Sequence, residues 1–463
     1  MKRFSKSMVF VIILILVGTM FMSGCEKENA TSQKTEEPTV SEKEPVTLTM
    51  TFWGSPQEKK AVEEAAKKFS DKFPNVTVKA IHIPESDYDA KIAAMVASGQ
   101  APDYAYIHGQ QGEQFAKEGK FYNWFELMEK DPEISKEDFV DDIWFRLNRD
   151  NAWAISGAVE CFGLFYNKDA FNEAGLDYPP SKFENSWTWD EFVNVAKNLT
   201  IDTNGNNANS PKFDPNNIKQ YGISFENWFG PVSVHVINNG GDFVLEDGKT
   251  FGYSKPEAYE AIQRLSDLIN VHHVAPSPIQ ARAIPGQAAA IESKLAAMSM
   301  HGQWINLDLG ANNVNYGIGV LPKMDKESGT LKISGAISIF KDTKHFEETW
   351  ELAKFMCGEG VESLYENGLW MPTMKKYYTD QELLKKWVGP NPAHPEGFKD
   401  AMLDMVMNHS KPAMVYTIKN QSKIDAMISA ALDPVWMGEK TAKEAMEELE
   451  TKIQPEIKGR YDK

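Results

Sequence analysis

Hydrophobic positions in the first part of the chain follow two different periods. Apolar residues occupy every second position from Val46 to Phe52, which predicts a strand that ends at Trp53. Between Pro56 and Pro74 apolar residues recur at helical spacing, with Lys and Glu on the opposite face, which predicts an amphipathic helix. The same two patterns then predict a strand near 76–81, a helix around 88–97 and a strand at 104–107.

This alternation of strands and helices is typical of a doubly wound α/β fold. Ligands of such folds bind beyond the carboxyl ends of the strands. The loop after Trp53 and the loop at 108–111 are two such ends, and both are therefore candidate binding loops. Helical spacing also predicts further helices at 189–198, 256–270, 346–358 and 441–453.

The first residues carry a different pattern. Three basic residues precede an apolar run from Met8 to Met22, which has the length of a signal-peptide core and is short for a membrane span. Small residues stand directly before Cys25, and this arrangement resembles the lipobox of bacterial lipoproteins. The resemblance implies that residues 1–24 are removed and that Cys25 carries acyl chains, palmitate among them, as a membrane anchor. A plain secretory peptide with an incidental cysteine is the alternative.

Composition and charge narrow the class of protein further. The 463 residues are 42% hydrophobic and 25% charged, which is ordinary for a globular chain of about two or three domains. With 49 Lys+Arg against 66 Asp+Glu, a net charge of −17 and no basic block, the chain is not expected to bind nucleic acid, whose phosphates need clustered cations. Residues 25–45 are polar after Cys25 and predict a flexible tether.

Two cysteines remain after the tether. Cys161 and Cys357 lie far apart in the sequence, and an exported protein stapled by disulfides would carry more cysteines. We therefore expect two buried thiols, with a single bridge as the alternative.

Catalytic motifs are absent or incomplete. The chain contains no G-x-S-x-G, H-E-x-x-H, C-x-x-C or G-x-G-x-x-G. The loop at 202–217 begins like a calcium loop, with Asp202, Asn204 and Asn206 at ligand spacing. However, Asn207 and Phe213 stand where that loop needs glycine and glutamate, so a polar surface loop is the preferred interpretation and no metal is expected.

Short motifs follow one another in order along most of the chain. They are Phe73-Pro74-Asn75-Val76-Thr77-Val78, Ala101-Pro102-Asp103, Phe165-Tyr166-Asn167-Lys168-Asp169, Pro179-Pro180, Trp187-Thr188-Trp189-Asp190-Glu191-Phe192, Lys294-Leu295-Ala296-Ala297-Met298, Gly302-Gln303-Trp304 and Tyr316-Gly317-Ile318-Gly319-Val320-Leu321-Pro322. Their order and spacing resemble the extracellular solute-binding proteins of carbohydrate ABC transporters, a family that includes maltose-binding proteins.

The resemblance implies a two-lobed periplasmic-binding-protein fold of type II, with doubly wound sheets, a hinge and a ligand cleft between the lobes. The crossing segments are expected near Val159, Ser334 and Trp370. The first lobe would then comprise 46–158 plus 335–369, and the second lobe 159–334 plus 370–463.

The resemblance also implies a set of sugar-binding residues. Glu160 and Glu226 match glutamates that accept sugar hydroxyls, and the aromatic rings match platforms on which a sugar ring stacks. Gln110 and Gln111 stand where maltose-binding members have charged residues, which argues against maltose itself. The full set of candidates is Trp53, His108, Gln110, Gln111, Glu160, Glu226, Trp228, Trp304, Trp370 and Tyr416.

The implied function is a receptor that captures an oligosaccharide outside the cell and delivers it to the permease subunits of an ABC importer. We expect a lipid-anchored monomer without cofactor on the outer face of a Gram-positive cell membrane. The sequence leaves the sugar, its linkage and any signalling role open. A lipid-anchored surface glycoside hydrolase is the alternative, because paired carboxylates cannot be recognised without coordinates.

Overall fold

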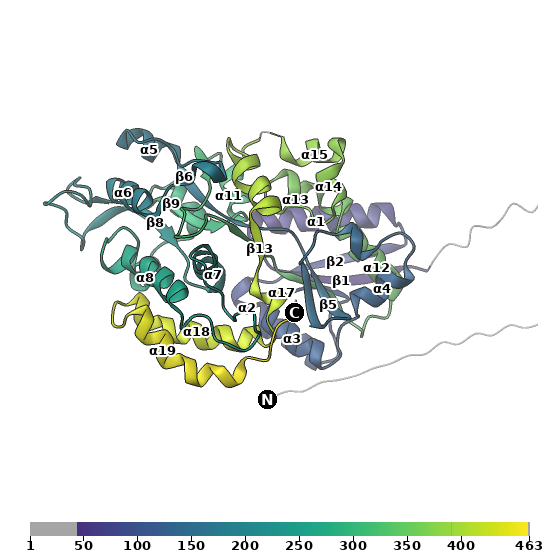
Figure 1. The fold of residues 1–463 in the computed structure, drawn as a ribbon. Coiled ribbons are helices and arrows are strands. Elements are labelled where there is room, and N and C mark those ends of the chain that lie inside the picture. The colour runs from purple at the N-terminus through teal and green to yellow at the C-terminus, as the bar shows by residue number, and fades with distance from the viewer. Residues whose placement is uncertain (1–43, 390, 462–463) are drawn as a thin grey trace, which may run out of the picture. The chain divides into compact units, whose positions relative to one another are not determined.

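Two mixed β-sheets organise the chain. A computed structural model describes residues 44–389 and 391–461 (Figure 1). The first sheet has the strand order β2-β1-β3-β12-β5-β4, the second has the order β10-β6-β9-β8-β7, and β11 pairs with β13 in a small separate sheet. The strands are β1 Val46–Phe52, β2 Val76–His82, β3 Tyr104–Ile107, β4 Trp144–Asn148, β5 Asn151–Ser156, β6 Phe162–Asn167, β7 Ile201–Asp202, β8 Ile218–Phe225, β9 Ala296–Gly302, β10 Tyr316–Gly319, β11 Thr330–Lys332, β12 Ala336–Ile339 and β13 Ser410–Pro412.

The first sheet confirms the predicted β-α-β-α-β start. Strand β1 pairs in parallel with β2 and β3, as a doubly wound fold requires. Strand β12 then inserts between β3 and β5 and is antiparallel to both. A segment far along the chain therefore completes the sheet that the first residues begin.

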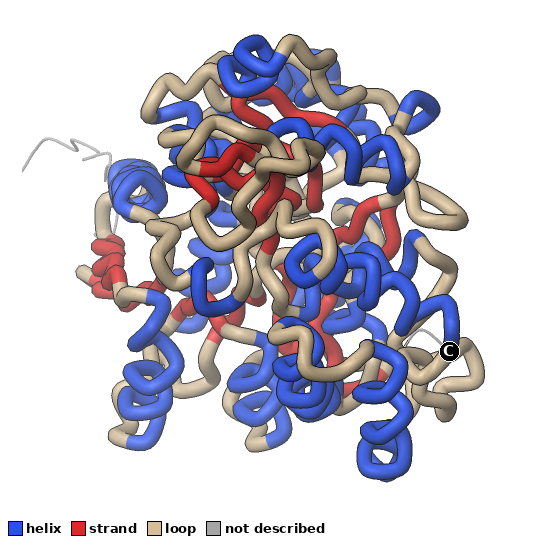
Figure 2. The backbone as a smooth tube through the Cα atoms, turned by 90° about the vertical axis from the view of Figure 1, so that its left-hand side faces the viewer, coloured by secondary structure: helices blue, strands red, loops and turns tan. Residues whose placement is uncertain are grey.

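Helices cover both sheets (Figure 2). The longer ones are α1 Pro56–Lys72, α2 Glu85–Ala97, α3 Gly109–Lys117, α4 Trp124–Lys130, α5 Lys168–Ala174, α6 Trp189–Leu199, α7 Phe229–Asn238, α8 Pro256–Asn270, α10 Gln287–Glu292, α11 Ile305–Ala311, α12 Phe346–Met356, α15 Gln381–Val388, α18 Gln421–Trp436 and α19 Ala442–Ile453. The shorter ones are η1 Lys136–Asp138, η2 Phe183–Asn185, α9 Pro278–Ala281, η3 Glu359–Val361, α13 Glu362–Glu366, α14 Lys376–Thr379, η4 Lys399–Asp404, α16 Met405–Asn408, α17 Met414–Thr417 and η5 Gln454–Glu456. All six helices predicted from periodicity are present, with ends that differ by up to three residues.

Local sequence signals set the start of the key helices. The side chain of Ser55 caps α1 by accepting a hydrogen bond from the backbone N–H of Glu58, and Pro56 occupies the first helical position. Thr188 and Glu191 form a capping box at the start of α6. The buried face of α1 is the predicted apolar one.

Three segments pass between the two sheets and hydrogen-bond to one another. Val159 exchanges backbone hydrogen bonds with Met371, and Glu160 exchanges them with Ile333. The N–H of Gly157 donates to the carbonyl of Gly335 at 2.9 Å. The segments expected to cross near Val159, Ser334 and Trp370 therefore lie side by side. We call the group 157–160, 333–335 and 369–371 the crossing strands.

The lobe boundaries stay a prediction. Strands from 46–156 and 336–339 share the first sheet, and strands from 162–319 form the second. The part after Trp370 contacts both sides, since α15 packs against α13 while η4 packs against β6.

Three other predictions concern single features. Cys161 and Cys357 are free and buried, which confirms the two thiols. The buried carboxylate of Asp202 accepts hydrogen bonds from the backbone N–H groups of Asn204, Asn206 and Asp214, so it organises its own loop as a polar turn. The signal peptide, Cys25 and almost the whole tether lie outside the described residues.

Candidate functional site

A cavity of about 690 Å³ lies between the two sheets, with the crossing strands at its base. Its lining residues come mainly from the carboxyl ends of strands and the helix starts that follow them. They are Trp53, Gly54, Ser55, Glu58, Glu85, Tyr106, His108, Gly109, Phe145, Gly157, Glu160, Glu226, Trp228, Phe229, Trp304, Asp308, Ile333, Ser334, Gly335, Ala336, Ile337, Leu369, Trp370, Val415, Gln421, Ser422 and Asp425.

Seven of the ten candidate residues line this cavity. These seven are Trp53, His108, Glu160, Glu226, Trp228, Trp304 and Trp370. Gln111 instead donates from its side-chain amide to the carbonyl of Asp89 at 2.6 Å and is not part of the lining. Gln110 belongs to α3, but its side chain is outside what the structure describes.

Tyr416 lies behind the cavity rather than in it. Its ring is buried and packs against Phe145, which does line the cavity. Its hydroxyl accepts a hydrogen bond from the backbone N–H of Ser334 at 2.9 Å and lies 3.0 Å from the hydroxyl of Ser156. Tyr416 thus holds a crossing strand in place.

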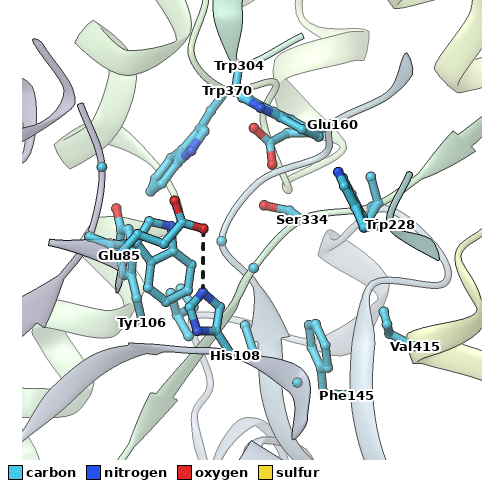
Figure 3. Close-up of a pocket in the computed structure, with 18 of the residues that line it drawn as sticks. Glu85, Tyr106, His108, Phe145, Glu160, Trp228, Trp304, Ser334, Trp370 and Val415 are labelled. Atoms are coloured by element: carbon cyan, nitrogen blue, oxygen red, sulfur yellow. Dashed lines mark ion pairs between the residues drawn. The ribbon is translucent and has the colours of Figure 1, made fainter. Parts of the chain in front are cut away.

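One side of the cavity is an aromatic cluster that follows the first sheet. Trp53 stacks on His108 with ring centroids 4.2 Å apart, and its edge meets Tyr106 at 5.1 Å. Tyr106 in turn lies 5.8 Å from Trp370 on a crossing strand. Figure 3 shows Tyr106 and His108 on this side with Trp370 above them. Trp53 follows β1 and His108 follows β3, so both predicted binding loops reach the cavity.

Two glycines make room for this cluster. A Cβ atom on Gly335 would lie 2.8 Å from the ring of Trp53. Gly54 has φ +134°, and a Cβ there would lie 1.9 Å from a carboxylate oxygen of Glu58. A side chain at either position would displace a lining residue.

The opposite side follows the second sheet. Trp228 comes after β8 and Trp304 after β9, and their rings lie 6.2 Å apart at 35°. Both pack against Phe162 of β6 at 5.8 and 5.7 Å. These two tryptophans are half-buried, so their outer faces remain available to a ligand.

Glu226 is compensated by its neighbours. Its carboxylate accepts a hydrogen bond from the Nε1–H of Trp228 at 2.7 Å and lies 3.5 Å from Nε2 of His301. Burial raises its pKa, but the bond and charge of His301 and the bond from Trp228 outweigh burial and bring the pKa below the ordinary value. Glu226 is therefore a preformed acceptor.

The pKa values of Glu160 and Glu58 are raised, in contrast to that of Glu226. Glu160 is only 6% exposed and projects from a crossing strand beside Trp304 and Trp370 (Figure 3). Burial raises its pKa to about 8, against which the hydroxyl bond with Ser334 has a smaller effect. Burial also raises the pKa of Glu58 well above its ordinary value.

Sequence reasoning missed several acidic lining residues. Glu58 lies one turn into α1, Asp308 in α11 and Asp425 in α18, and none belongs to a recognisable motif. The position of Glu58 in the first turn of the helix that follows strand β1 is a signal that could have identified it. Burial raises the pKa of Asp308 as well, and raises that of Asp425 to about 6.

The arrangement suits a ligand with flat apolar faces and many hydroxyls. Aromatic rings on both sides offer platforms, and carboxylates, a hydroxyl and an imidazole surround them. Among the described residues, no group of three or more His, Cys, Asp or Glu side chains is placed to hold a metal ion.

Two α/β halves, a cavity between them and a base of crossing strands define a two-lobed ligand-binding protein. Residues 53–362, more than half of the chain, match the family of bacterial extracellular solute-binding proteins. The chain belongs to this family.

Known proteins resemble this chain in sequence or in fold. The multiple sugar-binding protein of Streptococcus mutans is 21% identical over 431 residues, covering 85% of this chain and 93% of that protein. An ABC substrate-binding protein of Listeria monocytogenes, solved in complex with cycloalternan, has a TM-score of 0.75 at 22% identity, with 89% of this chain and 99% of that chain covered. The maltose/maltodextrin-binding domain of Bdellovibrio bacteriovorus, bound to maltotriose, has a TM-score of 0.69 at 19% identity, with 89% and 99% covered. At these identities the two structures establish the fold alone.

Proposed function

We propose that this protein is an extracellular receptor that captures an oligosaccharide and delivers it to the permease of an ABC importer. The observation that carries the proposal is the cavity itself, which sets aromatic platforms from two sheets against each other over a base of crossing strands. The sugar ligands named for related proteins agree with it.

In this proposal Trp53, Trp370, Trp228 and Trp304 stack on sugar rings. Glu226 accepts hydroxyl hydrogens, and Glu160 and His108 bind hydroxyls from the base and the first side. A ligand that touches both sides favours a closed arrangement by its differential affinity for that state. The crossing strands join the two sheets through the backbone, so we expect such a motion to bend them.

The hydrogen bonds of Gln111 and Tyr416 favour a role in holding loops in place over direct contact with the ligand. Gln111 is engaged with the backbone of Asp89, and Tyr416 with that of Ser334. We propose that both residues set the position of loops that meet the ligand.

We further propose that Cys25 is acylated and that the mature protein stands on the outer face of a Gram-positive cell membrane, as a monomer. The motif before Cys25 is the support for this part. Among the described residues, no helix combines the length and apolarity needed to cross a membrane. Mass spectrometry of the membrane-extracted protein tests the anchor, and Cys25→Ser should release the protein into the medium.

The experiment that tests the receptor is a thermal-unfolding screen of residues 26–463 against mono- and oligosaccharides, with product analysis of each hit. A ligand at a hundredfold excess over its dissociation constant adds about 2.7 kcal/mol of stability. A stabilising sugar that is recovered intact supports the receptor. A sugar recovered cleaved would favour the glycoside hydrolase, and no stabilisation by any sugar would contradict the proposal.

A further inference from the structure

The charge of the cavity is strongly one-sided. Its lining holds six acidic residues and neither lysine nor arginine. The acidic residues are Glu58, Glu85, Glu160, Glu226, Asp308 and Asp425. Carboxylates can accept hydrogen bonds from the hydroxyls of a neutral sugar, but a neutral sugar does not balance their negative charge.

Two of these acids already have a basic partner. Glu226 lies 3.5 Å from His301, and Glu85 lies 3.9 Å from His108. Figure 3 marks the second of these pairs. Both partners are histidines, which compensate a carboxylate fully only when they are protonated.

The other four have no cationic partner among the described residues. The hydroxyl of Ser334 lowers the pKa of Glu160 and that of Ser55 lowers the pKa of Asp308, in each case by less than burial raises it. Glu58 is 8% exposed and Glu160 6% exposed, so water does little to stabilise their charges. A buried carboxylate without a cation is costly, because a hydroxyl bond offsets only part of the lost hydration.

A second, independent feature indicates that the cavity is built around a ligand. Gln421 lines it from the start of α18 and is only 6% exposed. Its side-chain Nε2 has no hydrogen-bond partner in the described structure. A buried amide donor is normally satisfied, so a ligand acceptor at this position would complete it.

The proximity of the acids has a measurable consequence. The negative charges of Glu160, Glu85 and Asp308 add to the effect of burial on the pKa of Glu58. Burial likewise raises the pKa of Glu160, so both carboxyl groups hold a proton more tightly than a free glutamate does. A cation that enters would displace them, as linkage requires.

We infer that the sugar bound in this cavity carries a protonated amine, which the carboxylates around Glu58, Glu160 and Asp308 recognise. The inference deepens the proposed function and depends on it. The ligand class is an amino sugar or an oligosaccharide of amino sugars. The aromatic faces suit such a ligand twice, because they stack on the ring and attract an ammonium group. A bare metal ion fits less well, since the described residues contain no suitable ligand group.

Calorimetry with matched ligand series tests the inference on residues 26–463. The amines are glucosamine, galactosamine, mannosamine and glucosamine oligomers from dimer to tetramer. Each is compared at neutral pH with its N-acetylated form and with the neutral hexose or hexose oligomer. Spermidine serves as a cation without a sugar ring.

We expect at least one amine to bind about tenfold or more tighter than both of its uncharged counterparts, as charge-assisted hydrogen bonds do. Its binding should also release protons, which repeats in buffers of different ionisation enthalpy will detect. Glu58→Gln and Glu160→Gln should each lose most of this preference while retaining a native circular dichroism spectrum. Glu64→Gln is the matched control, because Glu64 is exposed on the same helix as Glu58.

Asp308→Asn and Asp425→Asn provide a second set of variants should either glutamine variant fail to fold. Equal or tighter binding of the uncharged counterparts would overturn the inference and leave the sugar receptor intact. Binding of spermidine without binding of any sugar would overturn both, and so would the absence of binding throughout all series.

Discussion

The pKa of a glutamate is shifted in opposite directions on the two sides of the cavity. On the second-sheet side, Glu226 receives a hydrogen bond from Trp228 and faces His301, and its pKa is lowered. At the base and on the first-sheet side, Glu160 and Glu58 are buried without a cation, and their pKa values are raised. The residue type alone therefore does not predict the charge of a carboxyl group in this cavity, because burial and neighbouring groups set its pKa.

This difference gives the two sides different roles. A carboxylate that already has a hydrogen-bond donor and a basic neighbour is pre-organised, so little free energy is spent on ordering it when a ligand binds. A buried carboxylate without a cationic neighbour is stabilised more by a ligand, because a cationic group on the ligand supplies the missing partner. We therefore expect the second side to position a sugar and the base to select it.

The largest expected effect concerns Glu160 and pH. Its folded-state pKa is about 8 against an ordinary 4.5, so the protonated form is favoured by folding. Its contribution is complete below about pH 4.5 and is lost as pH rises to about 8. Relative to Glu160→Gln, the wild type should lose on the order of several kcal/mol of unfolding free energy across this range, at about 1.4 kcal/mol per pKa unit.

Denaturant unfolding at pH 5 and pH 8 measures this difference. Glu226→Gln is the comparison, because a lowered pKa has the opposite sign: its contribution is present at neutral pH and is lost as pH falls. Parallel curves for the wild type and Glu160→Gln would contradict the assignment of a raised pKa.

The next effect is on affinity. Trp304→Ala removes a half-buried platform that packs on Trp228 and Phe162, so binding of the cognate sugar should weaken by about 2 to 3 kcal/mol. Titration calorimetry measures the change. Tyr178→Ala is the control, since Tyr178 is 40% exposed and outside the cavity. Equal losses in both variants would argue against a platform at Trp304.

A smaller effect is expected from Glu226→Gln. The amide keeps the shape and one acceptor but loses the charge that faces His301. Affinity for the sugar should fall by about 1 to 1.5 kcal/mol, the net value of a typical hydrogen bond, with Glu64→Gln unchanged. An unaltered dissociation constant would show that the second side does not position the ligand through this residue.

The smallest effect is expected for Tyr416, which packs behind the lining of the cavity. Tyr416→Phe removes the hydroxyl that accepts from the backbone of Ser334, which should cost about 1 kcal/mol of unfolding free energy and change affinity only slightly. Tyr104→Phe is the matched control, because the buried hydroxyl of Tyr104 has no hydrogen-bond partner among the described residues. If the two variants were equally stable, the bond to Ser334 would be unimportant.

Much of the fold could be predicted from the sequence. The period of apolar residues located β1, α1 and α6, because such patterns act over a few neighbouring residues. The antiparallel insertion of β12 beside β3 could not be predicted from periodicity, since it depends on pairing across more than half of the chain.

The candidate site was predictable where a motif or a strand end marked it. Trp53 and His108 follow strands, and Trp304 belongs to a recognisable motif. Asp308 and Asp425 carry no such signal, since helix α11 and helix α18 bring them to the cavity only when the chain has folded. The sequence placed Tyr416 among the residues that contact the ligand, whereas in the structure its ring lies behind the lining residue Phe145.

The sequence by itself determined the family, the strand and helix periods and most of the aromatic candidates. Short-range patterns encode these features, and burial of the apolar face follows from them. Only the tertiary structure decided which carboxylates share one cavity, which of them have a basic neighbour and which are largely buried. Charge state depends on distances between residues that are remote in sequence, and those distances exist only in the folded chain.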